Sequence, residues 1–293
     1  MISVVIPVCN EKPTLEPLCR ELERELPAPY EILFVDDGST DGAWEELARL
    51  HQAGRIRAIR FRRNFGKTAA LEAGFAAARG EVIFTMDGDL QDDPREIPRF
   101  LVMLGEGYDL VSGWKKVRHD WRGKVLASRL FNFVVRRVTG LRLHDVNCGF
   151  KAYRGELARS LPLHGELHRF TPVLAHAMGY RVGELVVAHH PRRHGRSHYG
   201  FSRLFRGFFD LITVVLLTRY AGRPLHAFGL AALVSLAAGI LLLGPPWWWP
   251  LPLLGLAFLV SAVVLFCAGL LAEIVVSRTP PAVPSYRIQE QLD

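Results

Sequence analysis

Val82-Ile-Phe-Thr-Met-Asp-Gly-Asp-Leu-Gln91 joins a short apolar run to an acidic loop. The run from Val82 to Met86 has the length and composition of a buried strand. Asp87 and Asp89 follow it at once, one residue apart, so both carboxylates can reach one divalent cation. Such oxygens are the hard ligands that Mg²⁺ and Mn²⁺ prefer, and the cation can in turn hold a diphosphate. The stretch therefore predicts a metal-assisted diphosphate site at a strand end.

Three further strands are predicted before this one, and helices separate them. We expect strands at Ile2–Val8, Glu31–Val35 and Ile56–Phe61, and helices at Thr14–Leu26, Asp41–Leu50 and Thr68–Ala78. The strands are short and apolar, whereas the helices repeat apolar residues at helical spacing. This alternation predicts an α/β fold with a doubly wound, mostly parallel, Rossmann-like sheet whose ligand lies at the carboxyl ends of the strands.

Polar clusters follow each of these three strands. They are Pro7-Val-Cys-Asn-Glu11, Asp36-Asp-Gly-Ser-Thr-Asp41 and Arg63-Asn-Phe-Gly-Lys67. The paired aspartates and Glu11 offer acceptors to a nucleoside, and Gly38 allows close backbone approach. Asp41 is interpreted as a helix cap, and Glu11 could equally be a solvated loop residue.

Two other nucleotide motifs are excluded. No GxGxxG follows a strand, and Gly66-Lys67-Thr68 lacks the first glycine of a P-loop because Phe61 stands at that position. Hydride transfer and Walker-type phosphoryl transfer are therefore poor interpretations.

The last quarter of the chain has the composition of a membrane segment. From Leu225 to Val276 the only ionisable side chains are His226, Cys267 and Glu273. Two apolar runs, 226–244 and 251–276, are each long enough to span a bilayer, and a Gly, Pro and Trp segment separates them. We expect a transmembrane hairpin, with a buried hairpin in a soluble protein as the alternative.

Flanking charge sets the expected orientation of this hairpin. Arginines precede the first run and follow the second, which places both ends in the cytoplasm. We therefore predict a cytoplasmic catalytic domain over 1–205, a juxtamembrane helix over 201–222, the hairpin over 225–276 and a loose cytoplasmic tail over 277–293. The flanking residues are Arg219, Arg223, Arg278 and Arg287.

The formal net charge of +7 is concentrated in two stretches. Nine Lys and Arg residues lie between Lys115 and Arg142 against one acid, and five arginines lie from Arg192 to Arg206. Such stretches beside membrane helices favour phospholipid head groups or a lipid phosphate over nucleic acid. Residues 117–138 and 201–217 have amphipathic helical spacing, so they are expected on the bilayer surface or, alternatively, packed on the soluble domain. The four cysteines form no CxxC pair and are expected to be reduced.

The motifs PVxNE, VDDGSTD, RNFGK and MDGDLQDDP, in this order at strand ends, resemble the GT-A fold of family 2 glycosyltransferases over residues 1 to 115. The segments Leu143 to Tyr153 and His190 to Gly200, followed by two membrane helices, narrow the resemblance. They are similar to those of polyprenyl-phosphate glycosyltransferases, which include dolichyl-phosphate mannose synthases and undecaprenyl-phosphate glucosyltransferases.

The resemblance implies roles for particular residues. Asp87, Asp89 and Gln91 would serve Mg²⁺ or Mn²⁺ and the diphosphate, with Asp89 and Gln91 also at the catalytic centre. The nucleotide-sugar site would comprise Pro7, Asn10, Glu11, Asp36, Asp37, Gly38, Asn64, Gly66, Lys67, Asp87 and Gly88. The acceptor phosphate would contact a loop that contains Arg192, Ser197 and Tyr199, together with clamps chosen from Arg118, Arg122, Lys124 and Arg129.

Three further residues have open interpretations. Asp145 is either an acceptor-side carboxylate at the catalytic centre or a structural hydrogen-bonding residue. His168 is a weaker pocket candidate. His198 stands where similar proteins commonly have Lys, so a permanent charge is replaced by one that titrates near neutrality.

The predicted function is inverting transfer of a hexose or related sugar from a UDP- or GDP-linked donor to a polyprenyl phosphate. It would occur at the cytoplasmic face of the inner membrane, in a multi-pass protein that contacts membrane lipids and for which a homo-oligomer is one arrangement. The alternatives are a family 2 enzyme with a saccharide acceptor, which usually carries a QxxRW segment that this chain lacks, and a non-catalytic sugar-nucleotide-binding protein.

Overall fold

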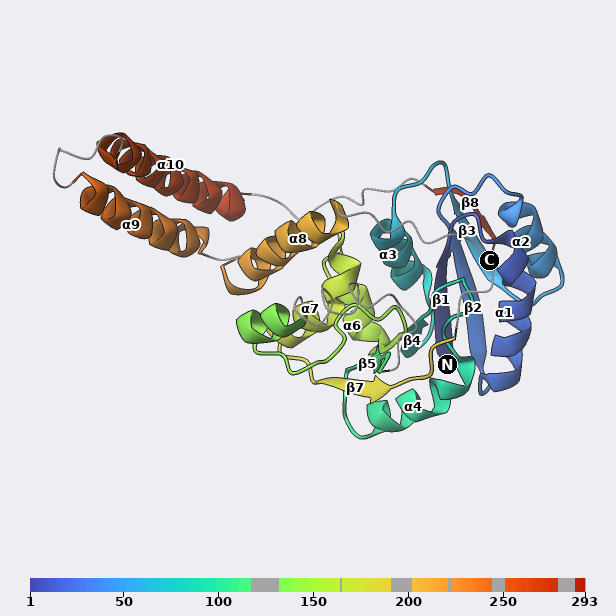
Figure 1. Ribbon diagram of the computed structural model, residues 1–293. Coiled ribbons are helices and arrows are strands. Elements are labelled where there is room, and N and C mark those ends of the chain that lie inside the picture. Colours follow the sequence, from blue (N-terminus) through green and yellow to red (C-terminus); the bar gives the residue numbers. More distant parts are fainter. Residues whose placement is uncertain are drawn as a thin grey trace. The chain divides into compact units, whose positions relative to one another are not determined.

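The computed structural model describes residues 1–116, 132–163, 165–190, 202–220, 223–243, 251–278 and 288–292. The chain divides into two compact units, Met1–Asp210 with Pro284–Asp293, and Leu211–Val283. Figure 1 labels most of the elements, which in chain order are β1 (Ile2–Val8), α1 (Lys12–Glu25), β2 (Tyr30–Asp36), α2 (Ala43–Gln52), β3 (Arg57–Phe61), α3 (Lys67–Ala77), β4 (Val82–Thr85), η1 (Pro94–Glu96), α4 (Ile97–Gly105), β5 (Leu110–Trp114), β6 (Lys151–Arg154), α6 (Gly155–Ser160), η2 (Leu167–Phe170), α7 (Thr171–Ala177), β7 (Val182–Val186), α8 (Ser202–Arg219), α9 (Pro224–Leu242), α10 (Leu251–Arg278) and β8 (Ile288–Leu292).

The first unit is built on one mixed sheet with the strand order β7-β5-β6-β4-β1-β2-β3-β8. The neighbouring strands β4, β1, β2 and β3 are all parallel, as the sequence predicts. β6 is inserted antiparallel between β4 and β5, and β5 pairs in parallel with β7. Because β6 runs against β4, the chain that precedes β6 reaches the same sheet edge as the chain that follows β4.

Helices cover both faces of the sheet, as a doubly wound fold requires (Figure 1). Alternate residues of β1 divide between the two layers. Ile2, Val4, Ile6 and Val8 join the core with α1, α2 and α4, whereas Val5 faces α3. A side chain at Gly74 of α3 would collide with Val5, so glycine lets this helix approach the centre of the sheet closely.

The predicted loose tail is wrong for residues 288–292. These residues form β8, which pairs antiparallel with β3 at the edge of the sheet. Leu292 lies opposite Ala58 and packs against the core. The chain therefore leaves the first unit, which contains the predicted catalytic domain and is called the catalytic unit below, and returns after the hairpin to complete the same sheet.

In the second unit α9 and α10 form an antiparallel pair within two residues of the predicted spans. Small residues let the two helices approach closely: a Cβ on Gly255 would lie 2.9 Å from the carbonyl oxygen of Gly239. Ser235 Oγ also donates to the carbonyl of Phe258 at 2.8 Å. Both helices are long and apolar enough to cross a membrane.

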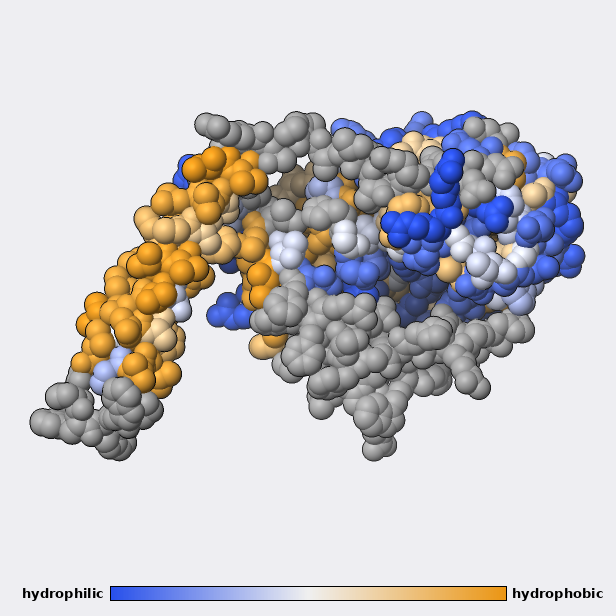
Figure 2. Space-filling view, turned by 90° about the horizontal axis from the view of Figure 1, so that it is seen from above, coloured by the Kyte–Doolittle hydropathy of each residue, from blue (hydrophilic) through white to orange (hydrophobic). Residues whose placement is uncertain are grey.

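Little of this apolar surface is covered by protein. Only 17% of the most apolar window of each helix is buried, and orange, hydrophobic residues cover the pair in Figure 2. A core hairpin of a soluble protein would be largely buried, so the exposure favours the transmembrane interpretation.

The two predicted surface helices are described in part. Residues 117–131 of the first lie outside the described residues, and 132–139 are helical. In that segment Val135 is buried, whereas Phe133 is 56% exposed. α8 falls within the range predicted for the juxtamembrane helix.

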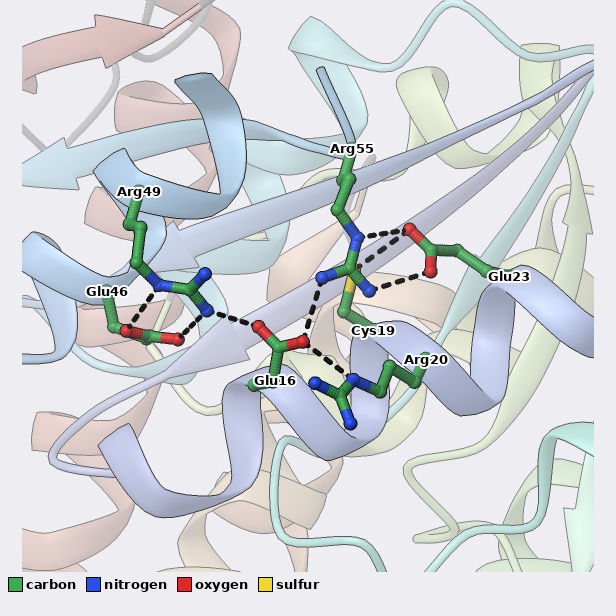
Figure 3. A network of polar contacts seen from close by, with 7 residues as sticks. All are labelled: Glu16, Cys19, Arg20, Glu23, Glu46, Arg49 and Arg55. Atoms are coloured by element: carbon green, nitrogen blue, oxygen red, sulfur yellow. Dashed lines mark hydrogen bonds and ion pairs between the residues drawn. The ribbon is translucent and has the colours of Figure 1, made fainter. Parts of the chain in front are cut away.

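A network of charged side chains joins α1 to α2 and to the loop before β3 (Figure 3). Arg55 lies at its centre: it donates to Glu23 at 2.6 and 2.7 Å and to Glu16 at 2.9 Å. Glu16 also pairs with Arg20 and Arg49. These guanidinium groups, Arg55 first, lower the pKa of Glu16 to about 2.

We predict that this network makes the catalytic unit acid-sensitive. The folded pKa of Glu16 lies below its usual value of 4.5, so ionised Glu16 stabilises the fold above pH 4.5 and that contribution is lost as the pH falls towards 2. Arg55→Met should lower the thermal unfolding midpoint at pH 7. It should also reduce the fall in this midpoint that the wild-type protein shows between pH 5 and pH 3. Arg24→Met, an exposed arginine of the same helix, is the control, and equal midpoint changes in both variants would contradict the assignment.

We also predict that β8 stabilises the catalytic unit. Deleting 288–293 removes the pairing with β3 and the packing of Leu292, so the melting midpoint should fall by at least about 2–4 °C, which corresponds to about 1 kcal/mol for a domain of this size. Deleting residue 293 alone is the control. An unchanged midpoint in the longer deletion would show that β8 adds nothing to the sheet.

Candidate active site

A pocket of about 380 Å³ opens at the carboxyl ends of β1, β2 and β4. It contains nine residues that the sequence assigned to the donor or metal site, contributed by four separate loops. Val8 and Cys9 complete the lining, and neither was predicted. The lining residues are Pro7, Val8, Cys9, Glu11, Asp37, Asn64, Gly66, Lys67, Asp87, Gly88 and Asp89.

Asp87 lies in the pocket within a group of positive charges. Its Oδ1 accepts from the Nζ of Lys67, the first residue of α3. Burial opposes ionisation of Asp87, but Lys67 and Lys115 hold its pKa well below the usual value, so the carboxylate is charged at neutral pH. Lys115 in turn forms a buried ion pair with Asp92 at 2.8 Å.

Asp89 is the more buried of the two loop carboxylates. It is 6% exposed, and its Oδ1 accepts from the backbone N–H of Gln91 at 3.2 Å. Leu90 between them has a φ of +60°, a left-handed conformation that costs energy for this residue type. The loop thus turns sharply and keeps both carboxylates on the pocket.

Two glycines leave space for the carboxylates of Asp87 and Glu11. A Cβ on Gly149 would lie 2.8 Å from both carboxylate oxygens of Asp87. A Cβ on Gly88 would collide with the carboxylate of Glu11. Gly149 is held in place by its carbonyl, which accepts from Thr85 Oγ1 at 2.7 Å.

The carboxylates of the pocket fit a divalent cation whose coordination is completed by phosphate oxygens. Asp87 and Asp89 present hard oxygen ligands to one pocket, in a cradle that added Cβ atoms would fill. Among the described residues no three His, Cys, Asp or Glu side chains converge to hold a metal by themselves. A cation bound here would therefore need ligands beyond the His, Cys, Asp and Glu side chains of the described residues, and the phosphate oxygens of a substrate can supply them.

Gln91 is placed away from the pocket lining. The side-chain Nε2 of Gln91 donates to the backbone carbonyl of His190 at 3.1 Å. The backbone carbonyl of Gln91 accepts from the backbone N–H of His190 at 2.9 Å. His190 Nε2 also contacts Asp93 at 3.2 Å, and Asp92 forms a backbone bridge with His189. The acidic loop thus holds the chain that leads into residues 191–201.

The side chain of Asp37 fixes the neighbouring loop. Its two oxygens accept from the backbone N–H groups of Phe65 and Gly66 at 2.6 and 2.9 Å. Gly38, with a φ of +73°, lets this loop approach, since a Cβ there would lie 2.5 Å from the carbonyl carbon of Arg63. Asp37 thereby sets the position of Lys67, which begins the following helix.

Three residues predicted for the nucleotide site support its loops and do not line the pocket. Asp36 is fully buried and accepts from the N–H of Ser39 at 2.9 Å. Asn10 Oδ1 accepts from the N–H of Thr40 at 2.8 Å, and Gly38 packs as described above. The prediction that Asp41 caps the following helix is wrong in detail, because Gly42 is the N-cap of α2. The Asp41 carboxylate lies one residue earlier and accepts from the N–H groups of Ala43 and Lys12, both at 3.0 Å.

Asp145 also lies outside the pocket lining. It is 1% exposed, its N–H donates to Glu184 at 2.8 Å and its Oδ1 accepts from the N–H of Asn147 at 3.3 Å. These contacts agree with the structural alternative for this residue. His168 is closer to the site: its Nδ1 lies 2.7 Å from Thr68 Oγ1, and burial together with Lys67 lowers its pKa, which keeps the ring neutral at pH 7.

The residues predicted to bind the acceptor phosphate lie outside the described residues. They are Arg118, Arg122, Lys124, Arg129, Arg192, Ser197 and Tyr199. Three unpredicted residues lie close to the acidic loop, namely Lys115, Gly149 and Lys151. Lys115 directly follows a strand, which is a signal that the sequence offered. Lys151 is buried on β6, where burial lowers its pKa to about 8 and its Nζ donates to the carbonyl of Cys148.

Comparison with known proteins agrees with this geometry. The family model described as glycosyl transferase family 2 matches residues 3–161, more than half of the chain. The chain belongs to glycosyltransferase family 2. The family predicted from the strand-end motifs is thereby confirmed, as is the GT-A-like sheet.

Curated family 2 relatives match nearly the whole chain. A dodecaprenyl-phosphate galacturonate synthase of Rhizobium johnstonii is 37% identical over 100% of this chain and 93% of its own length. An undecaprenyl-phosphate 4-deoxy-4-formamido-L-arabinose transferase of Pseudomonas aeruginosa is 37% identical over 93% of this chain and 84% of its own length.

A solved structure shares the fold. Glucosyl-3-phosphoglycerate synthase of Mycobacterium tuberculosis, in complex with Mn²⁺, UDP-glucose and phosphoglyceric acid, has a TM-score of 0.56 and 23% identity over 74% of this chain and 79% of that chain. At this identity the likeness concerns the fold alone.

We predict that Gly149→Ala weakens metal-dependent nucleotide binding by roughly tenfold, or about 1.4 kcal/mol, because the added Cβ displaces the Asp87 carboxylate. Calorimetric titration of UDP and GDP with Mn²⁺ would measure the change. Gly105→Ala, whose Cβ would contact nothing within 4 Å, is the matched control. Wild-type affinity in Gly149→Ala would show that Asp87 does not depend on this space.

Proposed function

We propose that this family 2 glycosyltransferase moves a sugar from a nucleotide diphosphate to a polyprenyl phosphate at the cytoplasmic face of the inner membrane, with inversion at the anomeric carbon. The observation that supports this most strongly is that Asp37, Lys67, Asp87 and Asp89, from three different strand-end loops, line one pocket. The two curated relatives described above are both named for a polyprenyl phosphate, and this supports the acceptor class.

We assign different residues of the pocket lining to different parts of the donor. Pro7, Glu11 and Asn64 would bind the nucleoside, and Asp87, Asp89 and Lys67 would bind the diphosphate and its metal ion. Mg²⁺ or Mn²⁺, when bound to these carboxylates, neutralises the diphosphate and improves it as a leaving group. The buried setting of Asp89 keeps its carboxylate fixed, so little reorganisation accompanies the reaction.

The acceptor needs positioning more than deprotonation. A phosphate monoester has a second pKa of about 6, so near pH 7 its oxygen is already anionic and attacks without a strong base. The buried, hydrogen-bonded position of Asp145 suits this mechanism, since no carboxylate has to accept a proton. The arginines predicted for the acceptor supply neutralising charge and orientation.

The membrane location is supported by the hairpin and by chain topology. Arg219, Arg223 and Arg278 flank the two apolar helices, and the positive-inside rule places these ends in the cytoplasm. β8 belongs to the sheet of the catalytic unit, so the chain crosses the membrane an even number of times before it returns. The exposed Phe133 and Arg137 of the 132–139 helix suit contact with anionic lipid head groups. A homo-oligomer is compatible with this arrangement.

We predict that membranes containing the protein transfer radiolabel from a UDP- or GDP-sugar to an organic-extractable lipid in the presence of Mn²⁺. Asp89→Ala should lower this transfer by about a hundredfold or more, because the metal and the leaving diphosphate lose a ligand. Glu45→Ala, which removes an exposed carboxylate from the same domain, is the control.

The two alternatives predict different products. Label in a water-soluble saccharide would identify a saccharide acceptor, and donor binding without any transfer would identify a non-catalytic protein. Full transfer by a folded Asp89→Ala variant would overturn the metal assignment.

A further inference from the structure

Glu184, on β7, is an acidic side chain that holds one short stretch of the chain. Only 10% of this side chain is exposed. Its Oε1 accepts from the backbone N–H groups of His144 and Asp145, each at 2.8 Å. Its Oε2 lies 2.8 Å from Nδ1 of the His144 ring. Hydrogen bonds to an ionised acceptor are roughly twice as strong as neutral ones, so Glu184 fixes the backbone at these two residues.

The neighbouring strand β5 supports the same stretch. Ser112 lies opposite Glu184 in the register of β5 and β7, and its Oγ donates to the carbonyl of Asp145 at 3.4 Å. At the end of β5 the Trp114 ring stacks on the His144 ring, with the ring centroids 4.0 Å apart and the planes inclined by 10°. Two strands and one aromatic stack therefore hold the beginning of the loop that leads to β6.

The end of this loop, residues 144–149, lies against the metal site. A Cβ on Gly149 would lie 2.8 Å from both carboxylate oxygens of Asp87, so the backbone at this glycine forms a wall beside that carboxylate. Val146 and Cys148, within the loop, are both buried. Because close-packed interiors have low compressibility and transmit strain, a shift at the beginning of so short a loop also moves its end.

A second connection to the metal site runs through the end of β5. Lys115 directly follows Trp114 in the sequence. Lys115 is also one of the two lysines that hold the pKa of Asp87 well below its usual value. Glu184 is thus connected to Asp87 by two routes, one through the 144–149 loop and one through the end of β5.

We propose that Glu184 is a positioning residue of the metal site: by fixing the 144–149 loop, it keeps the Asp87 carboxylate in the orientation that binds the cation. This inference rests on the proposed function, which requires a cation at Asp87 and Asp89. Glu184 contacts neither the cation nor the donor in this role. A carboxylate that is already confined to one orientation loses less conformational freedom when the metal binds, so the affinity for the metal rises.

Three substitutions at Glu184 separate its position from its charge. Glu184→Ala removes all three contacts and should weaken Mn²⁺ binding by about tenfold or more, as is typical when the support of a metal ligand is lost. Glu184→Gln keeps an oxygen that can accept from both backbone N–H groups, so it should recover most of the affinity. Glu184→Asp keeps the charge on a shorter side chain that no longer reaches the loop, so its affinity should fall towards that of Glu184→Ala.

Metal binding is measured on the full-length protein in detergent, without relying on turnover. Electron paramagnetic resonance would follow Mn²⁺ alone, and calorimetry would follow UDP and GDP in the presence of Mn²⁺. Thermal unfolding midpoints of the same samples show whether a variant has lost stability. Glu106→Ala, which removes an exposed glutamate from the same unit, is the matched control and should bind as wild type.

A double variant tests whether Glu184 acts through the loop. Gly149→Ala and Glu184→Ala would both disturb Asp87, so the loss of Mn²⁺ affinity in the combined variant should be smaller than the product of the two single losses. A combined loss equal to that product would show that the two residues act independently, and it would overturn the proposed route.

Two results at Glu184 itself would also overturn the proposal. One is a lowered unfolding midpoint with wild-type Mn²⁺ affinity in Glu184→Ala, which would indicate a role in stability alone. The other is wild-type affinity in Glu184→Asp with weak binding in Glu184→Gln, which would show that charge matters and reach does not. If Glu184→Ala does not fold, the comparison of the Asp and Gln variants decides.

Failure of the proposed function has a different signature. In that case the wild-type protein would bind neither UDP nor GDP in the presence of Mn²⁺. Failure of the positioning role alone would leave this binding intact in the wild-type protein and in the Glu184 variants. The two failures are therefore distinguishable.

Discussion

Backbone hydrogen bonding on both sides of β1 is the constraint on which the site depends. β1 pairs in parallel with β2 through all seven of its residues and with β4 through four. Parallel pairing in register brings the carboxyl ends of the three strands to one edge, and the polar loops that follow them are thereby collected into one pocket. The antiparallel β6 adds Gly149 and Lys151 to that edge, although about sixty residues separate them from Asp87 along the chain.

The aspartates at this edge of the sheet also need positive charges close to them. Asp87, Asp89, Asp92 and Asp93 would repel one another if they were left alone in a partly buried loop. Lys67 and Lys115 each pair with one of these carboxylates, and Arg95 pairs with Asp93. A chain without Lys67 and Lys115 would keep the acidic motif but would lose the charges that lower the pKa of Asp87.

Strand-end motifs predicted the sheet and most of the pocket, because parallel topology determines which loops meet. They could not show which of Asp36 and Asp37 lines the pocket. Adjacent residues of a strand point to opposite faces, and the position of the 63–67 loop decides which side chain lies at the pocket. Gln91 was assigned to the metal site because the resemblance of the MDGDLQDDP motif implied it. In the structure the chain turns sharply at Leu90, and the Gln91 side chain contacts the carbonyl of His190. β8 was missed because its five residues alternate polar and apolar side chains over too short a length to predict a strand. They form a strand because they pair with β3, and this pairing cannot be read from the local sequence.

The return of the chain to β3 has a consequence for biosynthesis. β8 follows both apolar helices in the sequence, so a ribosome synthesises it after the hairpin has emerged. Until then β3 is an open sheet edge, with unpaired backbone groups that can pair with other chains. Completion of the sheet thus comes after the membrane segments are made, and a chain that stalls within the hairpin carries an uncapped edge that quality-control proteases and chaperones can recognise.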